Sequence, residues 1–140
     1  MKKILLIQFI LSLAIFSCFG QESEKTGEQN KTKNDMIFVV VEEMPTFKGG
    51  DVYAFRDWVQ ERVRYPEELK AQKVEGKVYV MFVVETDGSV SNASIMRGVH
   101  PLLDKETLRV IKSSPKWKPG LQLDKAVRVR FSITVEYNLI

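Results

Sequence analysis

The chain has 140 residues, which is the length of one domain or of one domain with a short accessory segment. Hydrophobic residues make up 44% and charged residues 28%, as in a globular chain and unlike a fully disordered one. A single Cys and a single His exclude a disulfide framework, a Cys-rich zinc site and any site that needs two imidazoles. The net charge of +3 does not come from a stripe of basic residues, so it does not indicate nucleic acid as a partner.

Residues 1–20 have the pattern of a secretory signal peptide. Lys2 and Lys3 precede an apolar run over residues 4–16, and small residues follow before the polar stretch that opens at Gln21. The apolar run is near the lower length limit for a membrane span, so an uncleaved anchor stays open as an alternative.

Two processing sites compete at the end of this segment. Cys18 and Gly20 are small residues at positions −3 and −1 for cleavage before Gln21, which we favour. Residues 15–18 also resemble a lipobox, whose processing would leave Cys18 as a lipidated N-terminus. We therefore expect a protein of the bacterial cell envelope, periplasmic after signal cleavage or membrane-attached as a lipoprotein or by an uncleaved N-terminal segment.

Residues 21–35 predict a disordered polar tether. They contain no apolar side chain larger than Thr and cannot bury enough surface to offset the entropy of ordering. At about 5–6 Å times the square root of its length, such a tether spans only ~20 Å on average. The folded domain is then expected over residues 36–140.

The first part of this domain predicts one strand and two helices. The β-branched run at residues 36–41 is typical of a strand. A turn over residues 47–51 leads into a helix that begins at Val52, with Asp51 as its N-cap and apolar residues at helical spacing. Tyr65 precedes Pro66, which ends this helix and starts a short second one at its first position.

The second part predicts a hairpin, a helix and a last strand. Residues 77–85 are apolar on both faces, as in a strand that is buried on both sides or covered by a partner. Asp87-Gly88 is a strong hairpin signal, after which the chain returns over residues 90–96. A helix follows over residues 101–113, and from Val127 strict alternation predicts a strand with one core face and one solvent face. The domain is therefore an α+β unit.

No motif predicts catalysis, a cofactor or a metal. Gly49-Gly50 lacks a wider nucleotide-binding pattern and predicts a tight turn. His100 precedes Pro101 at a helix start and is expected to be a turn residue rather than a base or a ligand. Trp117 lies between two prolines, where we expect it to pack over the sheet and lock the crossover rather than stack on a base. The protein is predicted not to be an enzyme.

Motifs along residues 36–140 together carry a resemblance that none carries alone. They are Glu42-Glu43-Met44-Pro45-Thr46-Phe47-Lys48-Gly49-Gly50, Tyr65-Pro66, Gly76-Lys77-Val78, Asp87-Gly88 and Pro115-Lys116-Trp117-Lys118-Pro119-Gly120. In this order and spacing they resemble the TonB C-terminal domain, in the form common in Bacteroidetes-type bacteria. The resemblance implies a small antiparallel sheet packed against two to three helices, and a non-enzymatic binding role in TonB-dependent outer-membrane receptor transport.

The resemblance also implies a binding mode. The TonB box of an outer-membrane receptor, or a similar extended peptide, adds as a strand to an exposed sheet edge. In the family that edge belongs to the C-terminal strand, which here makes candidate partner-binding residues of Arg128, Arg130, Ser132, Thr134 and Glu136. The segment at the Tyr-Pro motif lies near the bound peptide, which adds Arg64, Tyr65 and Pro66.

The chain departs from full-length TonB in two places. Its apolar N-terminal segment has no His and looks cleavable, and residues 21–35 contain no Pro-rich spacer. These departures favour a stand-alone envelope binding module over a partner of an ExbB–ExbD-type motor. A short energy transducer with an uncleaved inner-membrane anchor and a structural assembly protein that forms a homodimer stay open as alternatives.

Overall fold

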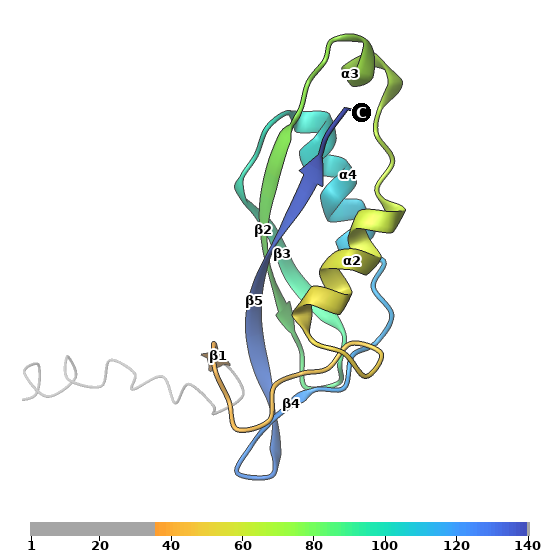
Figure 1. Ribbon diagram of the computed structural model, residues 1–140. Coiled ribbons are helices and arrows are strands. Elements are labelled where there is room, and N and C mark those ends of the chain that lie inside the picture. Colours follow the sequence, from red (N-terminus) through yellow and green to blue (C-terminus); the bar gives the residue numbers. More distant parts are fainter. Residues whose placement is uncertain (1–35, 140) are drawn as a thin grey trace, which may run out of the picture. The chain divides into compact units, whose positions relative to one another are not determined.

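The computed structural model describes residues 36–139 (Figure 1). The predicted signal peptide, Cys18 and the tether at residues 21–35 lie outside the described residues and stay predictions. The elements follow in the order β1 (Ile37–Phe38), α2 (Val52–Arg62), α3 (Glu67–Ala71), β2 (Gly76–Val84), β3 (Val90–Arg97), α4 (Pro101–Lys112), β4 (Gly120–Gln122) and β5 (Lys125–Tyr137). The α+β prediction is confirmed.

The sheet is built around the long antiparallel pair of β2 and β5. Their register runs from Gly76 opposite Tyr137 to Val84 opposite Val129. The strand order is β1-β5-β2-β3, so the predicted hairpin partner β3 forms one edge of the sheet, while β4 pairs with the start of β5. This arrangement is the predicted small antiparallel sheet, to which the short β1 adds a parallel pairing.

Helices α2 and α4 cover the same face of this sheet (Figure 1). The Asp51 carboxylate caps α2 by accepting from the backbone N–H groups of Tyr53 and Ala54, at 2.9 and 3.2 Å. The predicted turn residue His100 caps α4, because its Nδ1 accepts from the Leu102 N–H at 3.2 Å. Both caps satisfy donors that a helix start leaves without an intrahelical partner.

An aromatic cluster fills the core between the helices and the sheet. The ring centre of Phe55 on α2 lies 5.0 Å from that of Phe47, 5.1 Å from that of Phe82 on β2 and 4.9 Å from that of Trp117. Trp117 is 3% exposed, which confirms that it packs over the sheet. Its backbone N–H donates to the Gly88 carbonyl at 2.8 Å, so the crossover is tied to the β2–β3 hairpin.

Gly88 allows the close approach of the crossover to the hairpin, in addition to forming the turn. Its φ is +85°, and a Cβ built there would lie 2.0 Å from the carbonyl oxygen of Trp117. Any side chain at this position would therefore push the crossover away from the hairpin, in addition to the strain of the left-handed backbone.

Three expectations need correction. The strand expected over residues 36–41 is only Ile37–Phe38, because β5 offers partners only at Arg128 and Val129 and the next residues, Val39 and Val40, are 55% and 78% exposed. Strand β4 was not expected, because it lies beside the prolines of the crossover and its turn uses Leu123 and Asp124 at positive φ rather than Gly. Pro66 is the N-cap of α3 and not its first residue.

We predict that Trp117→Ala lowers the free energy of unfolding by about 3–5 kcal/mol, as for other buried aromatic side chains. Guanidinium denaturation followed by circular dichroism measures this loss. Trp58→Ala is the matched control, because Trp58 is only partly buried and should cost less. An unchanged midpoint for Trp117→Ala would contradict a core role for this ring.

Candidate functional site

The candidate site is the edge of β5 that faces away from β2. On that side, β4 pairs with residues 125–127, and β1 pairs with Arg128 and Val129. In a parallel pair a residue bonds to the two neighbours of the residue opposite, so Phe38, opposite Val129, also engages the N–H of Arg130. From Phe131 to Glu136, no strand among residues 36–139 pairs with this side of β5. A stretch of the strand is therefore an open edge of the sheet.

The contacts of Glu136 show which backbone groups point to this open edge. Its N–H donates to Oε1 of Gln60 at 2.9 Å, and its carbonyl accepts from Nε2 of Gln60 at 2.6 Å, so both groups face α2 and not β2. Backbone groups alternate between the two sides of a strand with a period of two residues. The N–H and C=O groups of Arg130, Ser132 and Thr134 therefore point to the same open side.

Side-chain direction follows the same period. Arg130, Ser132 and Glu136 are exposed and Thr134 is half-buried, whereas their odd-numbered neighbours Val129, Ile133 and Val135 are in the core. The predicted set from Arg128 to Glu136 thus shares one edge as well as one face. The groups at its two ends are already engaged, by β1 at Arg128 and by Gln60 at Glu136.

The side chain of Arg128 is engaged as well. Its guanidinium Nε and Nη2 donate to Oε2 and Oε1 of Glu85 at 2.8 and 3.0 Å, in a half-buried ion pair. Burial alone would raise the pKa of Glu85, but hydrogen bonds from Arg128 and Ser91 outweigh burial, and the pKa lies below its ordinary value. The ion pair therefore ties Arg128, next to the open edge, to Glu85 at the β2–β3 hairpin.

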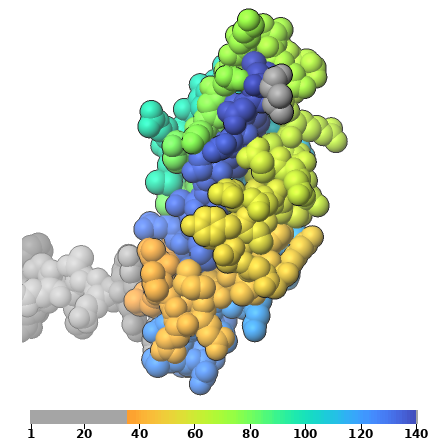
Figure 2. Space-filling view, in the orientation of Figure 1, coloured from red at the N-terminus to blue at the C-terminus, as the bar shows by residue number. Residues whose placement is uncertain are grey.

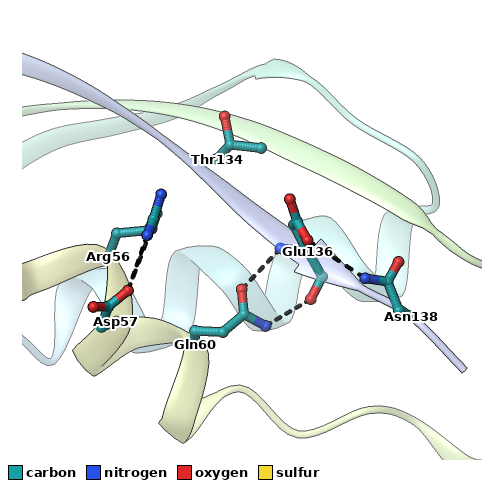
Figure 3. Close-up of a pocket in the computed structure, with 6 residues that line it drawn as sticks. All are labelled: Arg56, Asp57, Gln60, Thr134, Glu136 and Asn138. Atoms are coloured by element: carbon teal, nitrogen blue, oxygen red, sulfur yellow. Dashed lines mark hydrogen bonds and ion pairs between the residues drawn. The ribbon is translucent and has the colours of Figure 1, made fainter. Parts of the chain in front are cut away.

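Two hollows follow the open edge, between it and α2. One has a volume of about 490 Å³ and is lined only by polar residues, namely Arg56, Asp57, Gln60, Thr134, Glu136 and Asn138 (Figure 3). The other, of about 220 Å³, shares Arg56 and Thr134 with the first and adds Val52, Tyr53, Tyr79, Met96, Ser132 and Ile133. Figure 2 shows the atoms of α2 lying beside those of β5 on this face.

The second hollow opens onto the face of the sheet that the helices do not cover. Tyr79 on β2 is 37% exposed and Met96 on β3 is 60% exposed, while Tyr53 on α2 is 62% exposed. Burial of β2 on both sides is therefore incomplete at Tyr79, although Val83 is only 2% exposed. The outer side of the edge offers apolar surface next to unpaired backbone groups.

Arg64, Tyr65 and Pro66 lie at the far end of β5. The Arg64 N–H donates to Oε1 of Glu106 at 3.1 Å, the Tyr65 hydroxyl donates to the Val74 carbonyl, and Pro66 caps α3. The Tyr65 ring packs edge-on against that of Tyr137, with ring centres 5.6 Å apart. This segment holds the end of the edge strand and does not line either hollow.

Tyr137 itself is anchored in the core. It is 2% exposed, and its hydroxyl lies 2.9 Å from Oγ1 of Thr107, which in turn donates to the Leu103 carbonyl at 2.8 Å. Burial raises the pKa of Tyr137 to about 12. The strand therefore ends on a fixed, neutral hydroxyl next to Glu136.

Residues on α2 belong to the site that the sequence did not single out. They are Arg56, Gln60 and Tyr53, which line the hollows or contact the edge. Helical periodicity places polar side chains on a solvent face but says nothing about a sheet edge that comes from residues far along the chain. No local signal in the sequence identifies Gln60.

Within residues 36–139, no cluster of three or more His, Cys, Asp or Glu side chains could hold a metal ion. In the same range no helix is long and apolar enough to cross a membrane.

Known proteins are similar to this chain in sequence or in structure. The family model for the Gram-negative bacterial TonB protein C-terminal matches residues 61–139. The solution structure of the Helicobacter pylori TonB C-terminal domain, residues 179–285, has a TM-score of 0.51 at 22% identity, over 64% of this chain and 80% of that one. The solution structure of the Pseudomonas aeruginosa domain has a TM-score of 0.44 at 19% identity, over 58% and 84% of the two chains. No curated protein matches the chain.

We predict that Tyr137→Phe changes the alkaline stability of the domain. The folded pKa of about 12 lies above the unfolded value near 10, so the stability contributed by the neutral hydroxyl is complete below pH 10 and is lost as the pH rises toward 12. Between these values the wild type should lose on the order of 2 kcal/mol that Tyr137→Phe does not lose. Urea denaturation at pH 7, 10 and 11.5 measures the difference.

The control for this measurement is Tyr53→Phe, because Tyr53 is 62% exposed. It should follow the wild-type dependence on pH. Parallel curves for Tyr137→Phe and the wild type would contradict the assignment of the alkaline loss to this hydroxyl.

Proposed function

Because the chain belongs to the family of the Gram-negative bacterial TonB protein C-terminal, matched over residues 61–139, we propose that it binds an extended peptide along the open edge of β5. The family is a non-enzymatic protein-interaction domain of TonB-dependent transport in the bacterial envelope. Membership thus gives protein binding rather than catalysis as the class of function. The proposal adds where the partner lies and how it is held.

The single observation that carries the proposal is the set of backbone groups of Ser132 and Thr134, with the carbonyl of Arg130, at the open edge. A peptide in extended conformation can pair with such groups as a further strand. Each backbone hydrogen bond contributes about 0.5–1.5 kcal/mol net, so these few groups support a weak, reversible complex.

The opposite edge of the sheet is a poorer site for strand addition. The pairing of β2 with β3 has register shifts between Tyr79 and Val80 and between Met81 and Val83, and Asn92 on β3 has a φ of 50°. Bulges twist an edge strand away from the geometry that a further strand needs. The regular register of β5 over the same length favours its edge instead.

The proposed partner is the TonB box of an outer-membrane receptor or a similar extended peptide. Alternate side chains of an added strand face opposite sides of the sheet. One set would lie over the hollow with Tyr53, Tyr79 and Met96, where apolar side chains fit, and the other would face α2. Arg64, Tyr65 and Pro66 would then lie beyond the end of the bound strand, next to Glu136.

The location that goes with this function is the periplasmic side of the envelope. Cleavage before Gln21 would release the domain there, and lipidation at Cys18 would hold it at a membrane. Both belong to the part of the chain before residue 36 and stay proposals.

The test is a pair of substitutions at Ser132, which lies opposite Met81 on β2 but has no strand partner on its outer side. Ser132→Pro removes the outward N–H, and Pro is tolerated on the outer side of an edge strand. It should abolish binding of fluorescein-labelled peptides that carry the TonB boxes of receptors from the source bacterium, measured by anisotropy, with the circular dichroism spectrum retained. Ser132→Ala keeps the N–H and should bind within about twofold of wild type, because an exposed hydroxyl contributes little.

A second arm keeps the protein unchanged. N-methylation of the peptide at every second residue removes donors on one side only, so one of the two methylated series should lose binding and the other should keep it. Folded Ser132→Pro that binds like wild type, or two methylated series that bind alike, would contradict strand addition at this edge.

A further inference from the structure

Gln60 occupies one position of the open edge with its side chain. Its carboxamide donates to the carbonyl of Glu136 at 2.6 Å and accepts from the N–H of the same residue at 2.9 Å (Figure 3). Both bonds join residues 76 positions apart in the chain, and both partners are solvent-exposed. The contact therefore lies at the surface, where water could satisfy the same groups.

The pattern of these two bonds is that of a paired strand residue. In an antiparallel ladder, a residue of the hydrogen-bonded kind exchanges both of its backbone bonds with one residue opposite. A carboxamide has the same donor and acceptor as a peptide group. Gln60 thus substitutes for one residue of a neighbouring strand at the Glu136 position.

Together, β1 and Gln60 bracket the open edge. β1 pairs at Arg128, and Gln60 pairs at Glu136, with Arg130, Ser132 and Thr134 between them. The hollow that Gln60 lines has a volume of about 490 Å³, so the side chain has room to swing off the strand. The match to the family model begins at Glu61, so Gln60 lies one residue outside the matched segment.

We infer that Gln60 is an edge latch: a side chain that terminates the bound strand at Thr134 and so limits the partner to a short extended segment. The inference rests on the proposed function, because it concerns the same edge. A peptide that continues past Thr134 must replace the two bonds that Gln60 already makes to Glu136. The two hydrogen bonds from Gln60 to Glu136 are then lost and two from the peptide to Glu136 are gained, so the added length of the peptide contributes nothing to its affinity.

The consequence is a specific dependence of affinity on peptide length. The probes are acetylated, amidated peptides of alternating Thr and Val, five and nine residues long, with a fluorescein label. On the wild-type full chain the two should bind with dissociation constants within about twofold, because the exchange at Glu136 gains no hydrogen bond. On Gln60→Met, the nine-residue peptide should bind about tenfold more tightly than the five-residue one, through two newly available bonds.

Two further variants isolate the hydrogen bonds. Gln60→Glu keeps the size of the side chain and can still accept from the Glu136 N–H, but at pH 7 its carboxylate cannot donate to the Glu136 carbonyl, so its dependence on peptide length should fall between those of the wild type and Gln60→Met. Gln72→Met makes the same substitution at an exposed glutamine at the end of α3 and should behave like the wild type.

Amide hydrogen exchange of the peptide-free chain gives an independent readout. The Glu136 amide should be protected in the wild type and in Gln72→Met, and should exchange at least about tenfold faster in Gln60→Met, because opening then costs no hydrogen bond. A Glu136 amide that is equally protected in Gln60→Met would overturn the latch.

The outcomes separate the latch from the proposed function. Binding of both peptides with the same length dependence in the wild type and in Gln60→Met overturns the latch and leaves strand addition standing. Binding of neither peptide to any of the variants overturns strand addition and the latch with it.

Discussion

The antiparallel pairing of β2 with β5 determines which groups of this domain are buried and which are offered to a partner. Its register, from Gly76 opposite Tyr137 to Val84 opposite Val129, sends Val129, Ile133 and Val135 into the core beneath α2 and α4. The same register directs the backbone groups of the even-numbered residues, such as Ser132 and Thr134, to the outer side. A slip of one residue would exchange the two faces, so the core and the open edge depend on one another.

The helix that completes the core also shapes the edge. Phe55 and Val59 on α2 are fully buried in the aromatic cluster, which holds the helix along β5. The opposite side of the same turns carries Arg56 and Gln60 to the rim of the strand. Core packing thus positions the polar residues that line the edge, and loss of the cluster should alter the edge as well as the stability.

The sequence predicts those parts of the fold that local patterns determine. Asp51 and His100 mark helix starts, Asp87-Gly88 marks the hairpin, and strict alternation marks β5. Composition predicts a strand over residues 36–41, but only Ile37–Phe38 form one, because a β-branched run forms a strand only where a neighbouring strand offers partners. β4 escaped prediction because Leu123 and Asp124 adopt a turn conformation that the sequence ordinarily signals with Gly or Asn.

The candidate site was predictable only in part. The alternation of β5 identifies Arg130, Ser132 and Thr134 as a set, because side chains and backbone groups share a period of two residues. Which edge that set faces depends on the partner strand, and this is a long-range pairing. The contact of Gln60 with Glu136 depends on how the helix crosses the sheet, so no local pattern contains it.

The central claim is that a partner peptide adds as a strand to the outer edge of β5. Amide hydrogen exchange of the full chain, with and without a saturating TonB-box peptide from a receptor of the source bacterium, tests it most directly. We predict that the amides of Ser132 and Thr134 gain protection on binding, while those of Phe131, Ile133 and Val135, which face β2, stay as protected as before. Protection gained on β3 instead, or binding with no change at the amides of Ser132 and Thr134, would contradict the account.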